Sequence, residues 1–242
     1  FCGWVRVGHR PAENTLSVTV SESLLPVLPE VLARIKNLFD LYCEPKAVYE
    51  TLQVMNTLQP GLCVLGTRLP GCFNVFEMSV RAVLGQQITV KAASTLAARL
   101  VAVYGTQVQT GIEGLTHSFP APAAILALGE NISEHLGKLG IISARANTIY
   151  QLARVLADEK NDFGFCGNPE EEMQKLQAIR GIGSWTAQYI AMRAMGWPDA
   201  FLPTDAGIKK ALPDHTPKEL QVLSEAWRPW RSYATVNLWN TL

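Results

Sequence analysis

Residues 176–210 read LQAIRGIGSWTAQYIAMRAMGWPDAFLPTDAGIKK. Two glycines, Gly181 and Gly183, separate two helical segments, and a later loop rich in glycine and proline ends on a single carboxylate, Asp205. Glycine allows a sharp turn and a close approach of the main chain to another molecule. The pattern therefore predicts a helix-hairpin-helix, in which Ser184 caps a second helix over residues 185–195.

The first helix of this hairpin has its own start and stop signals. Asn168 can cap it, Pro169 suits its first position, and Glu171 completes a capping-box pattern with Asn168, so that the helix should end at Ala178 or Ile179. Unpaired amides at the N-terminus of the second helix would then bind a phosphate without a basic side chain.

Each feature also has a purely structural interpretation. A Gly-x-Gly pair is often only a tight connection between helices. An aspartate that follows Leu-Pro-Thr and precedes AGIKKAL, as Asp205 does, is first of all a helix N-cap.

Taken together, the hairpin and Asp205, joined by GWPDAFLPTD, resemble the helix-hairpin-helix, Gly/Pro-Asp superfamily of base-excision DNA glycosylases. Within it the chain is similar to the AlkA branch, DNA-3-methyladenine glycosylase II. Three further stretches carry the same likeness, so that it covers nearly the whole chain in one order: FDLYCEP, RLPGCFNVFEMSVRAVLGQQITVKAASTLAARL and AWRPWRSYATVNLW.

The resemblance implies a mainly α fold, the helix-hairpin-helix DNA glycosylase fold, with a small N-terminal α+β part that contains an antiparallel sheet. Alternating residues in GWVRV and TLSVTV predict a β-hairpin within residues 1–20. We expect an N-terminal α+β region at 1–50 and a helical domain with the hairpin at 75–197. Residues 51–74 and 198–242 should form a second helical part with the catalytic aspartate, and the active site should lie in the cleft between the helical parts.

Several caps predict where the other helices begin. Asn74 with Glu77, Thr89, Ser143 and Thr216 are placed to start helices. Residues 158–167 are predicted to form a polar linker.

Composition sets limits on the kind of protein. The chain has 242 residues, 48% hydrophobic and 17% charged, as is usual for a folded globular protein. Its formal net charge is zero, which is low for a nucleic-acid binder and predicts weak binding to DNA without a lesion. No apolar run approaches the roughly 20 residues of a membrane span. We therefore expect a cytoplasmic protein associated with the bacterial nucleoid.

The first residue is Phe1 and no signal peptide opens the chain. The chain is therefore expected to be a piece of a longer polypeptide, with a fused N-terminal regulatory region before it. A separate expectation is that the chain is a monomer.

The five cysteines form no C-x-x-C pair and are interpreted as reduced, buried thiols of an intracellular protein. Cys63 and Cys72 have no nearby histidine partner, so a zinc site is not expected. Some relatives carry a four-cysteine iron–sulfur cluster after the catalytic region, but no cysteine follows Cys166. No cofactor is expected to be required.

The chemistry implied by the resemblance centres on Asp205. Hydrolysis of an N-glycosidic bond passes through a sugar with oxocarbenium character, which a carboxylate facing the anomeric carbon stabilises. A helix N-terminus favours the ionised form that this role needs. Bifunctional members of the superfamily carry a lysine nucleophile where this chain has Trp185, which implies a monofunctional glycosylase that uses water and leaves an abasic site.

Aromatic residues point to the kind of base. Trp185, Tyr189 one helical turn later, and Trp239 match aromatic positions of the AlkA pocket. An alkylated purine carries positive charge, and a cation over an indole gains roughly 0.5–2 kcal/mol. Helix packing is the other interpretation of these aromatics. Ala206 stands where the AlkA branch has an aromatic residue, which implies a wider or less selective pocket.

The resemblance also assigns DNA contacts. It places Gly181, Gly183, Ser184 and Thr186 at the DNA backbone and an intercalating wedge at Gln87, in the loop of residues 85–88. The other interpretation is that both glutamines of this loop only bond to main chain. Main-chain carbonyls of the hairpin would hold a structural monovalent cation, Na⁺ or K⁺, at three residues: Gln177, Ile179 and Ile182.

The sequence thus predicts a monofunctional glycosylase that excises alkylated purines, of the 3-methyladenine and 7-methylguanine type, from double-stranded DNA. Two alternatives remain open. One is a non-catalytic DNA-binding module of an alkylation-response fusion protein. The other is an oxidised-base glycosylase with lyase activity, against which Trp185 in place of lysine argues.

Overall fold

The computed structural model describes residues 1–157 and 168–242, so that the whole of the predicted linker 158–167, with Cys166 within it, lies outside the described residues. The elements of the described part, apart from short 3-10 turns, follow along the chain as β1 Val5–Arg10, β2 Thr15–Val20, α1 Leu28–Leu38, α2 Pro45–Leu52, α3 Val75–Leu84, α4 Val90–Tyr104, β3 Thr106–Gln107, β4 His117–Ser118, α5 Pro122–Leu126, α6 Ile132–Gly137, α7 Ser143–Leu156, α8 Pro169–Ala178, α9 Ser184–Ala194, α10 Ala206–Ala211, α11 Pro217–Leu223 and α12 Arg231–Trp239.

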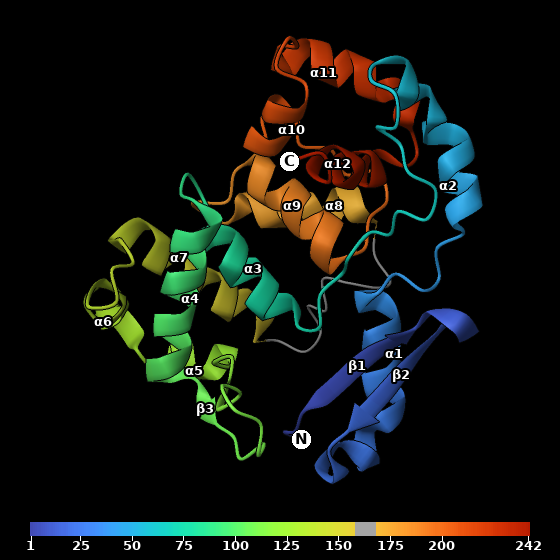
Figure 1. Ribbon diagram of the computed structural model, residues 1–242. Coiled ribbons are helices and arrows are strands. Elements are labelled where there is room, and N and C mark those ends of the chain that lie inside the picture. Colours follow the sequence, from blue (N-terminus) through green and yellow to red (C-terminus); the bar gives the residue numbers. More distant parts are fainter. Residues whose placement is uncertain (158–167) are drawn as a thin grey trace.

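The N-terminal part is the predicted β-hairpin with one helix against it. Strands β1 and β2 are antiparallel, with Val5 opposite Val20 and Arg10 opposite Thr15. Valines on one face of the hairpin pack against Val31 of α1, which is 5% exposed. In Figure 1 this small layer of β1, β2 and α1 is drawn in dark blue at the lower right. The predicted mainly helical fold with an antiparallel N-terminal sheet is confirmed.

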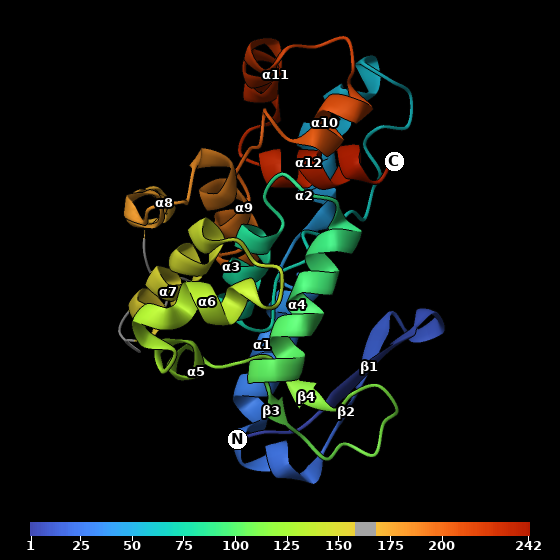
Figure 2. The same cartoon turned by 90° about the vertical axis from the view of Figure 1, so that its left-hand side faces the viewer.

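The middle of the chain forms a helical bundle in which α3 packs on both α7 and α9. Its core is made of aliphatic side chains that recur at helical spacing and are almost completely buried. The fully buried members include Val80, Val83, Leu84, Leu100, Ile149, Leu152 and Ile190. The long helix α4 runs along this bundle, and β3 and β4 follow at its end (Figure 2).

A second helical core joins segments that are far apart in sequence. Leu52 of α2 and the following Met55 are 0% exposed and belong to one apolar cluster with Phe201, Ile208 and Trp227. Figure 1 shows α2 lying beside α11 and α12, near the C-terminus. The chain therefore leaves this part after Leu69 and returns to it in α9. Met192 of α9 belongs to this cluster and Ile190 of α9 to the first one, so α9 lies between the two helical cores.

Most predicted helix starts are confirmed. The Asn74 side chain accepts from the Glu77 amide at 2.8 Å, and that of Thr89 accepts from the Ala92 amide at 3.2 Å. Thr216 and Glu219 form the complete capping box.

Two predicted caps are wrong by one residue. Gly183 is the N-cap of α9 and Ile142 that of α7, so that Ser184 and Ser143 are already helical and make no capping bond. The N-cap must have extended backbone. Gly183 and Ile142 have it, with ψ of 177° and 151°.

The expectation of uniformly buried thiols is wrong in part. Cys63 is buried, but Cys43 and Cys72 are half-buried and Cys2 is exposed; all four are free thiols. Burial raises the pKa of the Cys72 thiol to about 11.

Within residues 1–157 and 168–242, no helix has both the length and the hydrophobicity that are needed to span a lipid bilayer.

Candidate active site

Asp205 is held at the N-terminus of α10. Its Oδ1 accepts hydrogen bonds from the main-chain amides of Gly207, at 2.8 Å, and Ile208, at 3.1 Å. Its backbone is extended, with φ −67° and ψ 136°, as an N-cap requires. The residue is 8% exposed. The N-cap interpretation is therefore correct, and it directs the carboxylate away from solvent into the protein.

Two tryptophans complete the surroundings of this carboxylate. Nε1 of Trp239, in α12, donates to Oδ1 at 2.8 Å, and Nε1 of Trp185, in α9, donates to Oδ2 at 3.1 Å. An indole N–H can only donate. Asp205 thus accepts from four N–H groups of three helices, which fixes the orientation of both oxygens.

The same tryptophans belong to an aromatic cluster. Trp185 and Tyr189 stack with ring centroids 5.2 Å apart and planes 9° from parallel. Their spacing of four residues puts them on one face of α9. Tyr189 also lies 6.3 Å from Trp239, tilted by 47°. All three are half-buried, and Tyr189 packs against both helical cores. The packing interpretation holds, yet two of the three rings, those of Trp185 and Trp239, also contact the carboxylate. Ala206 is exposed beside Asp205.

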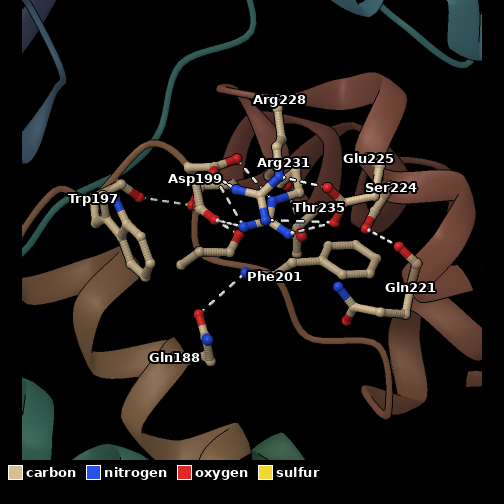
Figure 3. A network of polar contacts seen from close by, with 12 residues as sticks. Gln188, Trp197, Asp199, Phe201, Gln221, Ser224, Glu225, Arg228, Arg231 and Thr235 are labelled. Atoms are coloured by element: carbon tan, nitrogen blue, oxygen red, sulfur yellow. Dashed lines mark hydrogen bonds and ion pairs between the residues drawn. The ribbon is translucent and has the colours of Figure 1, made fainter. Parts of the chain in front are cut away.

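A buried ion-pair network supports the segment that leads to Asp205 (Figure 3). Arg231, at the start of α12, donates to both carboxylate oxygens of Asp199, from Nε at 2.7 Å and Nη2 at 3.0 Å, and Nη2 also reaches the Asp199 carbonyl at 2.8 Å. Arg228 pairs with Asp199 from the more exposed side, and Glu225 contacts both arginines. The sequence does not predict this network, because no local sequence pattern links Asp199 to Arg231, which lies 32 residues later in the chain.

Ser232 extends this support along the main chain. Its Oγ lies 2.7 Å from the carbonyl oxygen of Trp197 and 3.1 Å from that of Ala200, which share its single hydrogen, and its amide donates to the Pro198 carbonyl at 2.8 Å. The first turn of α12 therefore holds residues 197–200, while Trp239 in its last turn holds Asp205. One helix thus braces both ends of the loop that carries the carboxylate.

The hairpin glycines differ in what surrounds them. Gly181 has φ of +96°, and a Cβ built on it would lie 2.0 Å from Oγ1 of Thr148, in α7. Gly183 has φ of −86° and open space where a Cβ would be. Gly181 is thus required by the fold itself. Gly183 and the exposed Ser184 present the N-terminus of α9 to the outside.

The loop of residues 85–88 lies against this hairpin. Gln86 Nε2 donates to the Gly181 carbonyl at 3.0 Å and to Thr186 Oγ1 at 2.9 Å. For Gln86 the interpretation as a residue that bonds to main chain is thus correct. Thr186 is 3% exposed, so its side chain faces this loop instead of an open surface. Gln87 is exposed and has φ of +56°.

The three residues expected to hold a cation lie at the bend between α8 and α9. Among the described residues, the carbonyl oxygens of Gln177 and Ile182 accept no hydrogen bond, and that of Ile179 accepts one, from the Ile182 amide at 3.0 Å. These oxygens retain free lone pairs, the donor type that Na⁺ and K⁺ require. Elsewhere in the described ranges, no group of three or more His, Cys, Asp or Glu residues is arranged to hold a metal ion.

Comparisons with known families match almost the entire chain. Residues 2–74 match the family model described as AlkA N-terminal domain. Residues 80–231 match the model described as HhH-GPD superfamily base excision DNA repair protein. This segment of the chain contains the hairpin and Asp205.

Individual relatives extend this finding. DNA-3-methyladenine glycosylase 2 of Escherichia coli is 38% identical over 230 residues, which covers 95% of this chain and 78% of that protein. The probable bifunctional transcriptional activator/DNA repair enzyme AlkA of Mycobacterium tuberculosis is 40% identical, and the match covers 87% of this chain but 42% of that protein. The solved 3-methyladenine DNA glycosylase from Archaeoglobus fulgidus has the same fold, with a TM-score of 0.77 at 22% identity over 97% of this chain and 81% of that one.

Proposed function

Because the chain belongs to the HhH-GPD superfamily of base excision DNA repair proteins, we propose that it is a monofunctional DNA glycosylase that hydrolyses the N-glycosidic bond of alkylated purines. 3-Methyladenine and 7-methylguanine are the substrates we expect. The names of two relatives support this choice, since the Escherichia coli and Bacillus subtilis proteins are both called DNA-3-methyladenine glycosylases.

The observation that carries the proposal is the carboxylate of Asp205, oriented by the indoles of Trp185 and Trp239. In the reaction the bond between C1′ and the base nitrogen breaks, and its electron pair leaves with the base. The sugar becomes an oxocarbenium-like cation, which the negative carboxylate stabilises. Water then adds to C1′ and loses a proton to solvent, which leaves an abasic site.

The aromatic cluster supplies a reason for the base. Tyr189 stacks on one face of the Trp185 indole and has the Arg193 guanidinium over its own ring, 5.8 Å from the centroid. An alkylated purine that bears a positive charge would therefore be attracted by the other face of Trp185, and stacking on a half-buried ring needs no matched hydrogen bonds. Such a base is also a good leaving group, because departure neutralises it. The reaction therefore needs little general-acid catalysis, and the main contribution of the protein to the rate is electrostatic stabilisation of the transition state by Asp205.

Trp185 also supports hydrolysis over lyase chemistry. A lyase needs an amine that attacks C1′ and forms a Schiff base. At the position where that amine would lie, this chain has an indole whose N–H is donated to Asp205. The nucleophile that remains is water.

Double-stranded DNA with an alkylated base is the proposed partner, bound by one copy of the chain. The amides at the N-terminus of α9, from Ser184 onward, would hold a phosphate. Gln87 would occupy the space left by the extruded base, whose unstacking costs a few kcal/mol. A monovalent cation on the carbonyls of Gln177, Ile179 and Ile182 would strengthen the phosphate site, because it adds positive charge beside the amides.

The test is release of methylated purines from alkylated duplex DNA by wild type, Asp205→Asn and Asp214→Asn. Asp214 is exposed and lies just beyond α10, so its replacement makes the same chemical change outside the site. We expect wild type and Asp214→Asn to release 3-methyladenine and Asp205→Asn to lose at least ~100-fold.

Two other results would replace the proposal. Binding of alkylated DNA without release of a base by any of the three proteins would identify a binding module. Trapping of a DNA–protein adduct with borohydride would show lyase chemistry.

A further inference from the structure

Gln86 joins two segments that are 95 residues apart. Its Nε2 lies 3.0 Å from the carbonyl oxygen of Gly181 in the hairpin and 2.9 Å from Oγ1 of Thr186 in the first turn of α9. The carbonyl can only accept, which fixes the amide with its NH₂ group toward the hairpin. Both hydrogens of that group are therefore engaged on the element that would bind the DNA backbone.

Helix α7 closes this link into a ring. Arg145 of α7 donates from Nη2 to the main-chain oxygen of Gln86. One turn later, Thr148 Oγ1 lies 3.0 Å from the carbonyl oxygen of Arg180 and 3.0 Å from that of Ala144 in its own helix, and the two oxygens share its single hydrogen. The 85–88 loop is thus bonded to the hairpin, the hairpin to α7, and α7 back to the loop. Each of the three segments is held by the other two.

The ring leaves one side chain of the loop unattached. Gln87 is exposed, and its side chain makes no hydrogen bond within the described residues. Its φ of +56° is a conformation that residues other than glycine seldom adopt, so the surrounding contacts must hold it there. The bonds of Gln86, its neighbour, are the contacts in place to do so.

We propose that Gln86 is a positioning residue that fixes the loop of Gln87 on the hairpin, so that the side chain entering the DNA and the amides holding the DNA backbone act as one rigid body. This inference rests on the proposed function. A wedge on a loose loop must lose conformational freedom on entering the duplex, which lowers the yield of extruded base. A wedge already fixed relative to the phosphate anchor avoids that loss.

The test separates extrusion from bond cleavage. Base release is measured under single-turnover conditions on one methylated oligonucleotide, presented as a duplex and as a single strand. In the single strand no base pair has to be opened, so a wedge has nothing to replace. The variants are Gln86→Ala, Gln86→Glu, Gln87→Ala and the double variant Gln86→Ala/Gln87→Ala. Gln86→Glu keeps the shape and loses the NH₂ donor, and Gln109→Ala, an exposed glutamine in the connection after β3, is the matched control.

We expect Gln86→Ala and Gln86→Glu to lose about 5- to 20-fold on the duplex, the range for removal of one doubly bonded donor, and less than about twofold on the single strand. Gln87→Ala should show the same pattern. The double variant should be no worse than Gln87→Ala alone, because Gln86 acts through Gln87. Equal losses on both substrates would overturn the proposal, as would losses that multiply in the double variant.

A second readout does not depend on catalysis. Each protein is titrated onto a duplex with an abasic-site analogue opposite 2-aminopurine, whose fluorescence reports insertion beside it. Wild type should change the fluorescence and Gln86→Ala should reduce that change at saturating protein. An identical change for both proteins, or no change with wild type, overturns the proposal. Absence of base release by wild type would instead count against the proposed function.

Discussion

Nε1 of Trp239 lies 2.8 Å from Oδ1 of Asp205, so that the last turn of α12 orients a carboxylate 34 residues earlier in the chain. The same oxygen caps α10 through two main-chain amides. Capping alone would leave the carboxylate free to pivot about its helix end. The indoles of Trp239 and Trp185 remove that freedom, because each oxygen then has its own side-chain donor.

Trp239→Phe tests this orienting role. It keeps an aromatic ring but removes the donor to Asp205, and we expect base release under single-turnover conditions to fall about tenfold, as for loss of one hydrogen bond to a charged group. Trp230→Phe makes the same replacement at the other end of α12, where the indole faces Tyr233, and should change the rate less than twofold. Similar rates for wild type and Trp239→Phe would contradict the role.

Alanine at the two hairpin glycines should separate folding from DNA binding. Gly181→Ala places a Cβ 2.0 Å from Thr148 Oγ1 at a φ of +96°, and we expect it to lower the free energy of unfolding by roughly 2–4 kcal/mol. Gly183→Ala meets nothing in the protein and should cost less than about 1 kcal/mol. It should nevertheless weaken DNA binding, since the new methyl group lies where a phosphate would approach. Urea denaturation measures the free energy of unfolding of both variants, and DNA titration measures their affinity. Unchanged DNA affinity of Gly183→Ala would argue against a phosphate contact at this position.

The ion-pair network predicts a contrast between two arginines. The Arg231 side chain is 7% exposed, and Arg231→Met would leave Asp199 buried without its bidentate partner, which we expect to cost about 3–5 kcal/mol of unfolding free energy. The Arg228 side chain is 47% exposed, so Arg228→Met should cost about 1 kcal/mol or less. Urea denaturation of the two variants measures this, and equal costs would refute the assignment of Arg231 as the buried member.

Thiol reactivity should follow burial. Because burial raises the pKa of the Cys72 thiol to about 11, only about one molecule in a thousand carries its thiolate at pH 8. Cys2 is exposed. We expect iodoacetamide to label Cys2 first and Cys72 far more slowly, with the rate at Cys72 still rising tenfold per pH unit between pH 8 and 10. Mass spectrometry of labelled peptides gives both rates, and a plateau for Cys72 below pH 9 would contradict the raised pKa.

The predicted helix starts show how far local patterns reach. Asn74, Thr89 and Asp205 cap their helices as expected, because a short polar side chain on the last extended residue before a helix meets amides two or three positions later. Ser184 does not, although it is the preferred residue type, because the chain leaves its extended conformation one residue earlier, at Gly183. The geometry of the turn, with Gly181 pressed against Thr148, decides where α9 begins.

The sequence by itself determined the features that depend on near neighbours: the hairpin glycines, Asp205 at a helix start, and Trp185 and Tyr189 on one helical face. Only the tertiary structure decided that Trp239 donates to Asp205, that Asp199 pairs with Arg231, and that Gln86 bonds to Gly181. Caps and helical spacing depend on hydrogen bonds between residues two to four positions apart, and such pairs can be recognised directly in the sequence. Contacts over 32 to 95 residues exist only because two hydrophobic cores bring α3, α9 and α12 together, and the position of a helix in a core depends on all the side chains buried with it.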